Sequence, residues 1–268
     1  MTAIIIVGFA LLGLAVGSFL NLCIDRLPQH KSIVSPRSHC DGCQRRLETV
    51  DLVPLFSYIW LRGRCRYCGA RIPLRIAIVE LATGVIFAVL AWYYYQSFGL
   101  GAELAFSLVY AALFIVIFVT DLEQGLVLNN VVLFGLALAL VFSFFQTGFE
   151  DFFPKLGPGI ALSALLGGAV GFAIMLLPYL ISRGGMGAGD VKLAGLIGVV
   201  VGFPQVIAAL LVGIVIGGIV AVFLLLARLR GRKEAVPFGP FLAAGAMVAL
   251  VWGEGLIEWY RTTLTNLG

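Results

Sequence analysis

Charged residues are scarce in this chain of 268 residues. Only 12% of the residues are Asp, Glu, Lys or Arg, whereas 61% are hydrophobic; a soluble domain carries roughly 25% charged residues. A fold of this size cannot hide that much apolar surface, so lipid must cover part of it. A lipid-facing β-barrel would alternate apolar and polar positions, but the apolar runs here are continuous. The composition therefore predicts an all-α polytopic membrane protein.

Several familiar catalytic patterns are also missing. The two histidines are His30 and His39, and neither an H-E-x-x-H zinc pattern nor a G-x-S-x-G nucleophile elbow occurs. A glycine-rich cofactor fingerprint is absent as well. The sequence therefore carries none of these signatures of zinc-dependent proteases, serine hydrolases and soluble methyltransferases.

About eight membrane helices are predicted from the apolar runs. The sixth run is short, but residues 193–228 are too long for one helix across a core of about 30 Å, and Gly202-Phe203-Pro204 interrupts them. The runs lie at about residues 3–22, 76–96, 103–120, 126–146, 158–181, 190–202, 205–228 and 238–259.

Lys and Arg are unevenly distributed between the loops. Residues 23–75 hold ten of the 18, and six more are Arg183, Lys192, Arg228, Arg230, Arg232 and Lys233. With eight helices and the N-terminus outside, all of these fall on one side, which the positive-inside rule assigns to the cytoplasm. We therefore expect the basic residues to set the topology and contact anionic lipid, with no role for nucleic acid.

Four of the five cysteines form two C-x-x-C pairs. Cys40 and Cys43 are followed, after 21 residues, by Cys65 and Cys68. Two such pairs can supply four thiolates to one tetrahedral ion, and the reducing cytoplasm disfavours disulfides. We predict a structural zinc in a small cytoplasmic loop domain, with free or transiently oxidised thiols as the alternative. Cys23 is interpreted as a small buried residue.

Two aspartates stand at ends of predicted membrane helices. Asp121 ends the third and Asp190 begins the sixth, and the topology places both at the cytoplasmic boundary, where they can meet. Two carboxyl groups about 3 Å apart share a proton, so one acts as base on a water while the other polarises a carbonyl. The alternative is that Asp190 is a helix cap and Asp121 a boundary charge.

Other polar residues and glycines accompany these acids. Glu123 and Lys192 are candidates for tuning the pair or binding substrate, and Gly187 and Gly189 would let a substrate strand approach the backbone. Glu80 lies early in the second predicted helix. Because an unpaired acid there is costly, we expect it to pair with Arg26 or Arg75.

Five ordered motifs extend from about residue 13 to 245. They are Gly17-Ser18-Phe19-Leu20-Asn21 with Arg26-Leu27-Pro28, the two cysteine pairs, Pro54-Leu55-Phe56-Ser57-Tyr58, Gly187-Ala188-Gly189-Asp190-Val191-Lys192, and Pro237-Phe238-Gly239-Pro240-Phe241. Together they resemble the bacterial type IV prepilin peptidases, which are membrane aspartic proteases.

This resemblance implies an enzyme with two activities in the bacterial inner membrane. Such enzymes cleave the basic leader of type IV prepilins or pseudopilins after glycine at the cytoplasmic face, then methylate the new N-terminus with S-adenosylmethionine. It implies that Asp121 and Asp190 are catalytic and that the four cysteines bind zinc. The expected organisation is a first helix (1–22), a zinc-binding domain (23–75) and a protease domain (76–268).

One position departs from the family pattern. Leu128 stands where a proline is common, although the following Asn129 is kept, so the turn into the fourth helix is expected to differ. For the methyl donor, we expect Asn21, Arg26 and Glu80, near the first loop, to contribute.

Two other classes of function remain as alternatives. A transporter or channel would use the two aspartates as ion sites, and an assembly scaffold would use the cysteine loop to dock partners. The sequence leaves open the oligomeric state and which pilin-like substrates are processed.

Overall fold

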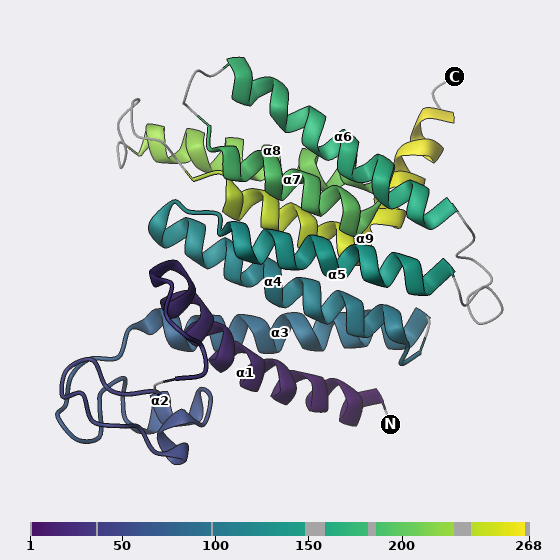
Figure 1. Ribbon diagram of the computed structural model, residues 1–268. Coiled ribbons are helices and arrows are strands. Elements are labelled where there is room, and N and C mark those ends of the chain that lie inside the picture. Colours follow the sequence, from purple (N-terminus) through teal and green to yellow (C-terminus); the bar gives the residue numbers. More distant parts are fainter. Residues whose placement is uncertain are drawn as a thin grey trace. The chain divides into compact units, whose positions relative to one another are not determined.

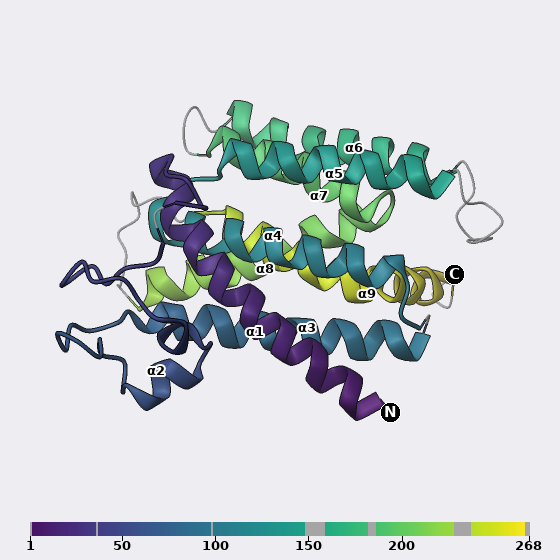
Figure 2. The ribbon, with the colours of Figure 1, turned by 60° about the horizontal axis from the view of Figure 1, so that its bottom comes forward.

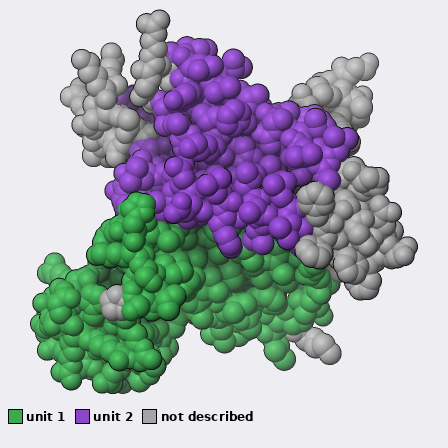
Figure 3. Space-filling model, in the orientation of Figure 1, with its two compact units in different colours: residues 1–116 green, residues 117–268 purple. Residues whose placement is uncertain are grey.

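The computed structural model describes residues 2–35, 37–97, 99–147, 159–181, 186–227 and 237–265. Two compact units make up the chain, residues 1–116 and 117–268, coloured separately in Figure 3. The basic residues Arg183, Arg228, Arg230, Arg232 and Lys233, used above to predict topology, lie outside the described residues.

The prediction of an all-α fold is confirmed, since no strand occurs in the described ranges (Figure 1). Two short 3-10 helices, η1 (Leu27–Gln29) and η2 (Thr49–Leu52), lie in the first long loop. The α-helices are α1 (Thr2–Arg26), α2 (Phe56–Trp60), α3 (Leu74–Ser97), α4 (Ala102–Gln124), α5 (Asn129–Thr147), α6 (Gly159–Ile181), α7 (Ala188–Val201), α8 (Gln205–Leu226) and α9 (Gly239–Thr265).

Each predicted apolar run overlaps one of the helices α1 and α3 to α9, and within the described residues five of these are long and apolar enough to cross a membrane. The five are α1, α3, α4, α6 and α8. Among the residues whose side chains are described, α5 and α9 contribute the shorter apolar stretches Asn129–Phe142 and Gly239–Gly253, and α7 has 14 residues. The chain is therefore a multi-pass membrane protein, while a total of eight spans stays a prediction.

In unit 1, α1 packs against α3, and the two helices cross at an angle in Figure 2. Glycines bring the two backbones into close approach, because a Cβ on Gly17 would lie 2.7 Å from the Cα of Glu80. A Cβ on Gly13 would lie equally close, 2.7 Å, to the carbonyl oxygen of Thr83. The chain between these two helices forms the loop that carries the cysteine pairs.

In unit 2, the short helix α7 contacts α5, α6, α8 and α9. Its side chains are buried around much of its circumference, including Leu193, Ala194 and Ile197, as expected for an apolar helix inside a bundle. Gly198 packs so tightly against Gly167 of α6 that neither has space for a Cβ. This packing fixes the position of the first turn of α7, which carries Asp190.

The break between α7 and α8 confirms the prediction of two helices there. Gly202 takes a positive φ of 74° after the last turn of α7. The N–H of Phe203 then donates to the carbonyl oxygen of Ser163, at 3.1 Å, which ties the turn to α6.

Candidate functional site

Asp121 and Asp190 are both buried within unit 2. Asp121 lies in the last turn of α4 and Asp190 in the first turn of α7, with 4% and 7% of their surfaces exposed. The charge of Asp121 acts on the Asp190 carboxyl group. The fold therefore brings the two acids near each other although they belong to different helices.

Asp190 is not the N-cap of α7. Gly187 holds that position, and the N–H of Asp190 donates to the Gly187 carbonyl at 3.1 Å. The Asp190 side chain thus lies inside the first turn, where the positive end of the helix dipole stabilises a negative charge. The capping alternative considered from the sequence is wrong on this geometry.

Gly239, the first residue of α9, lies against Asp121. Its backbone N–H is directed to the Asp121 carboxyl group. A Cβ on Gly239 would lie 2.6 Å from Oδ2 of Asp121. That oxygen is buried and finds no hydrogen-bond partner in the described part of the chain. The absence of a side chain at Gly239 therefore allows α9 to approach and orient the acid.

Val127, in the segment after Asp121, fits between the starts of α7 and α9. A Cβ on Gly189 would lie 2.8 Å from Cβ of Val127, and one on Gly239 would lie 3.3 Å from its Cγ2. By contrast, a Cβ on Gly187 would lie at an ordinary 3.6 Å from Oδ2 of Asp190. Because Gly189 and Gly239 have no side chains, the start of α7, the start of α9 and the segment around Val127 can meet beside the acids.

Lys192 and Asn129 join two helix starts at the surface. The Lys192 ammonium donates to Oδ1 of Asn129 at 3.0 Å, linking α7 to α5. The helix begins at Asn129 without the proline, and the Leu128 carbonyl accepts from Val131 and Val132. Glu123 is exposed in the last turn of α4.

Cys40, Cys43, Cys65 and Cys68 form a compact cluster in unit 1. Their four sulfur atoms lie within 4.8 Å of one another, and the Sγ atoms of Cys40 and Cys68 are 3.8 Å apart. A tetrahedral ion with metal–sulfur bonds of about 2.3 Å requires sulfur–sulfur distances of about 3.8 Å. The cluster thus fits a tetrahedral ion such as zinc.

Residues 38–47 and 63–72, which contain the two cysteine pairs, repeat one backbone geometry. In each segment the residue after the second cysteine has a positive φ, 55° at Gln44 and 70° at Gly69. The shared contacts are the N–H···O=C bonds from Cys40 to Arg45 (2.9 Å) and Cys65 to Ala70 (2.8 Å), those from Leu47 to Ser38 (3.0 Å) and Ile72 to Gly63 (2.8 Å), and the bridges His39–Arg46 and Arg64–Arg71. Two equivalent turns therefore present four sulfurs to one point.

The thiols in this cluster differ in acidity. The backbone N–H groups of Cys68 and Tyr67 lower the pKa of Cys65 to about 7. The N–H of Ala70 acts in the same direction on Cys68, but burial and the neighbouring thiols raise the pKa of Cys68 to about 12. At least one thiol is therefore ready to lose its proton near neutral pH.

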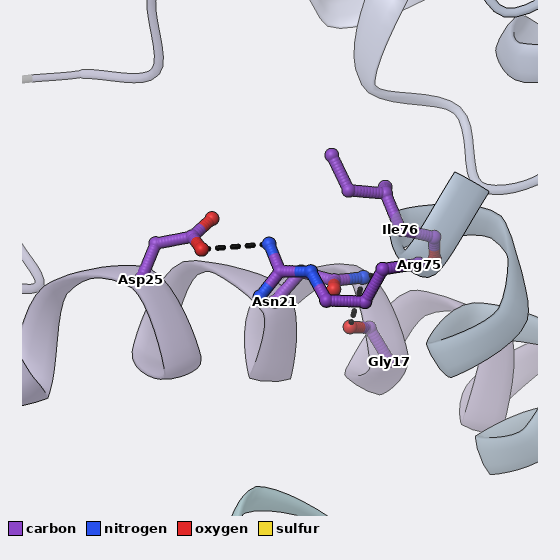
Figure 4. A network of polar contacts seen from close by, with 5 residues as sticks. All are labelled: Gly17, Asn21, Asp25, Arg75 and Ile76. Atoms are coloured by element: carbon purple, nitrogen blue, oxygen red, sulfur yellow. Dashed lines mark hydrogen bonds and ion pairs between the residues drawn. The ribbon is translucent and has the colours of Figure 1, made fainter. Parts of the chain in front are cut away.

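Asn21 links α1 to α3 in unit 1 (Figure 4). Its Nδ2 donates to the carbonyls of Gly17 (3.2 Å) and Ile76 (3.0 Å). Its Oδ1 is buried and lacks a hydrogen-bond partner among the residues that the structure describes. Nearby in Figure 4, Arg75 pairs with Asp25 at 2.6 Å. The structure thus leaves a buried acceptor on Asn21.

Glu80 and Arg26 bind the main chain of the loop. The Leu55 N–H donates to Oε2 of Glu80 at 2.8 Å, and the Ser18 hydroxyl also donates to this buried carboxyl group. Arg26 donates from Nη1 to the Ser32 carbonyl at 2.9 Å. A pairing of Glu80 with Arg26 or Arg75 stays a prediction. The Leu55 contact was not foreseen, because no sequence pattern marks it.

Two family models match the chain. The model described as the Bacterial Peptidase A24 N-terminal domain matches residues 11–94, and that of the Type IV leader peptidase family matches residues 108–222. The acids Asp121 and Asp190 fall in the second match, and all four clustered cysteines fall in the first. No solved structure matches the chain significantly.

Similar curated proteins come from several bacteria, and those described here are named prepilin leader peptidase/N-methyltransferase. The protein of Bacillus subtilis is 32% identical over 251 residues, covering 92% of this chain and 94% of its own length. That of Pseudomonas putida is 31% identical over 285 residues, covering 96% and 93%. That of Aeromonas hydrophila is 30% identical over 282 residues, covering 94% and 92%.

The cluster geometry predicts one tetrahedral ion per chain. Cys65→Ser and Cys68→Ser should each lower the metal content well below one ion, because the fourth ligand is lost. Elemental analysis and the absorption of the cobalt-substituted protein measure this. Cys23→Ala is the matched control, since Cys23 lies in α1 apart from the cluster. Full metal content in Cys68→Ser would contradict the assignment.

Proposed function

The chain belongs to the type IV leader peptidase family, and on this premise we propose that it cleaves the leader peptide from type IV prepilins or pseudopilins and methylates the new N-terminus. It is a peptidase with methyltransferase activity. The observation that supports the cleavage site best is the pair of buried acids in unit 2, where the charge of Asp121 acts on Asp190.

In the proposed reaction, Asp121 and Asp190 share one proton and hold a water between them. The ionised carboxyl group takes a proton from the water as it attacks the scissile carbonyl, and the protonated one donates a hydrogen bond to the carbonyl oxygen. Oδ2 of Asp121, which lacks a partner in the described residues, is a suitable acceptor for this water. No covalent intermediate with the protein is needed.

The substrate must present an extended strand to these acids. Its main-chain polar groups lose water near the bilayer, so the site must supply hydrogen bonds in return. Gly187, which is exposed, offers open backbone just before Asp190, whereas Gly189 packs against Val127. We propose that the substrate strand lies beside Gly187. Glu123 would add negative charge that attracts the basic leader. The Lys192–Asn129 hydrogen bond would hold the starts of α7 and α5 together beside the strand.

The proposed topology places these acids at the cytoplasmic face of the inner membrane, with the N-terminus outside. A prepilin-like substrate would then keep its basic leader in the cytoplasm and its apolar helix in the bilayer. Cleavage at this boundary avoids moving charged peptide into lipid, which is costly.

We propose that the four clustered cysteines hold a structural zinc in a domain over residues 23–75, between a first helix (1–22) and a protease domain (76–268). Four thiolate ligands leave no open coordination position, so the ion would order the loop without taking part in cleavage. A loop of this size has too little apolar core to fold strongly alone.

For methyl transfer, S-adenosylmethionine would supply an electrophilic methyl group to the new amine. We propose that Asn21, Arg26 and Glu80 line the donor side in unit 1. The buried, unpartnered Oδ1 of Asn21 in the described structure supports this, because a bound molecule with an N–H or O–H group would satisfy it.

Replacing either acid should stop cleavage and leave methylation possible. Asp121→Asn and Asp190→Asn should each lower kcat for a model prepilin by about 10²–10⁴-fold or more, the usual contribution of general acid–base catalysis. A gel-shift assay of leader removal measures this, and a pre-cleaved pilin with labelled methyl donor measures the second activity. Glu103→Gln, at the other end of α4, is the control. Unchanged cleavage in either Asn variant would remove that residue from the mechanism.

Adding a methyl group at Gly239 should misplace Asp121. Gly239→Ala should lower kcat for cleavage by about 10²-fold, as expected for a shift of about 1 Å at a catalytic group, with a smaller change in KM. Gly255→Ala on the same helix is the matched control, because nothing lies within 4 Å of the added Cβ. Equal kinetics for the two variants would show that Gly239 does not position the acid.

The proposed contacts to S-adenosylmethionine are tested separately. Asn21→Ala, Arg26→Ala and Glu80→Ala should lower methylation of a pre-cleaved pilin at limiting S-adenosylmethionine more than they lower leader cleavage. Parallel measurement of both activities gives the comparison. A variant that methylates normally excludes its residue from the donor side.

A further inference from the structure

Helix α2, in the loop between α1 and α3, exposes an apolar face. Phe56, Ile59 and Trp60 are 59%, 71% and 73% exposed, and their spacing places them on one side of the helix. The Phe56 and Trp60 rings are stacked, with centroids 5.9 Å apart. The loop around them, residues 23–75, holds ten basic and four acidic residues. An apolar face of this kind in a charged loop needs a partner.

A partly buried hydrogen bond fixes where α2 begins. Leu55, just before the helix, has the rare backbone angles φ 56° and ψ −44°, which persist only where the surrounding structure holds them. Its N–H donates to Oε2 of Glu80 in α3 at 2.8 Å. The start of α2 is therefore attached to a residue inside a membrane-crossing helix.

The position of Glu80 gives the depth of this attachment. Glu80 lies six residues after Leu74, the first residue of α3, or about 9 Å along the axis at 1.5 Å per residue. The 24 residues of α3 span about 36 Å, and the hydrocarbon core is about 30 Å thick. If α3 is centred in the core, about 3 Å of helix extends beyond each face, so Glu80 lies below the membrane surface.

The ribbon views agree with this depth. In Figures 1 and 2, α2 lies at the level of the end of α3 at which that helix begins, while the rest of the cysteine loop extends further from the helices. Both α2 and α3 belong to unit 1.

We propose that α2 lies in the headgroup region of the membrane and inserts Phe56, Ile59 and Trp60 into lipid. Tryptophan favours this region because its apolar ring enters the lipid while its N–H stays hydrated, and phenylalanine is common on the apolar face of interfacial helices. Arg62 and Arg64 follow the helix and are exposed, which suits contact with anionic headgroups. The cysteine loop is then attached to the bilayer at α2 as well as at its two ends.

We assign lipid as the partner because the Leu55–Glu80 hydrogen bond holds α2 near the membrane surface. This contact is present without any substrate. A protein partner would have to displace lipid from a face that Glu80 keeps at the membrane surface. The proposal requires only that α3 crosses the membrane, so it can fail while the proposed peptidase activity stands, and the reverse.

The test uses the full chain in nanodiscs that contain anionic lipid and no prepilin. Substituting Trp92, Trp252 and Trp259 with Phe leaves Trp60 as the single tryptophan. We expect lipids brominated near the headgroup end of the acyl chain to quench its fluorescence, and aqueous acrylamide to quench it weakly. Its emission should also be shifted to shorter wavelength relative to the control.

The control combines Trp60→Phe with Asp41→Trp in the same background, because Asp41 is exposed in the first cysteine turn. This tryptophan should be quenched by acrylamide and little affected by brominated lipid. If the multiple variant does not fold, the difference between the unmodified chain and Trp60→Phe gives the same quenching. Trp60 behaving as the control does, or becoming protected only after prepilin is added, would overturn the proposal.

Discussion

A carboxyl group taken from water into an apolar helix bundle loses hydration that is worth of order several kcal/mol. Asp121 and Asp190 are both buried and both bear this cost, and the charge of Asp121 adds to it at Asp190. Unit 2 offsets part of the cost with main-chain groups. The first turn of α7 surrounds Asp190, and the Gly239 N–H faces Asp121. Close glycine contacts join α6 to α7 and α8 to α9, where larger residues would hold the helices apart.

In unit 1, buried polar side chains also form hydrogen bonds with main-chain groups. Glu80 accepts from the Leu55 N–H, and Asn21 donates to carbonyls of α1 and α3. The first family match, residues 11–94, lies within unit 1, and most of the second, residues 108–222, lies in unit 2. We infer a division of labour in which unit 2 carries the cleavage chemistry and unit 1 carries the metal cluster and the proposed methyl-donor residues.

The helices could be predicted from the sequence because continuous apolar runs encode them locally. Their ends were less accurate: α4 continues past residue 120 to Gln124, so Asp121 lies within its last turn. The cysteine cluster was also predictable, since its spacing is local and its two turns repeat. The roles of Gly239, Val127 and Leu55 were not, because each depends on a contact with a residue far away in the sequence. Sidedness stays a prediction, since it rests on charges that partly lie outside the described residues.

The convergence of the two acids is best measured without reference to activity. In a Cys23→Ala background, Asp121→Cys and Asp190→Cys can be combined and treated with a short bifunctional thiol reagent, while the metal protects the clustered cysteines. We predict an intramolecular cross-link between positions 121 and 190, detected by mass spectrometry, and a much lower yield when Glu123→Cys replaces Asp121→Cys. A shared catalytic site would be contradicted if the 121–190 pair did not cross-link, or cross-linked no better than the 123–190 pair, in membranes and with prepilin bound.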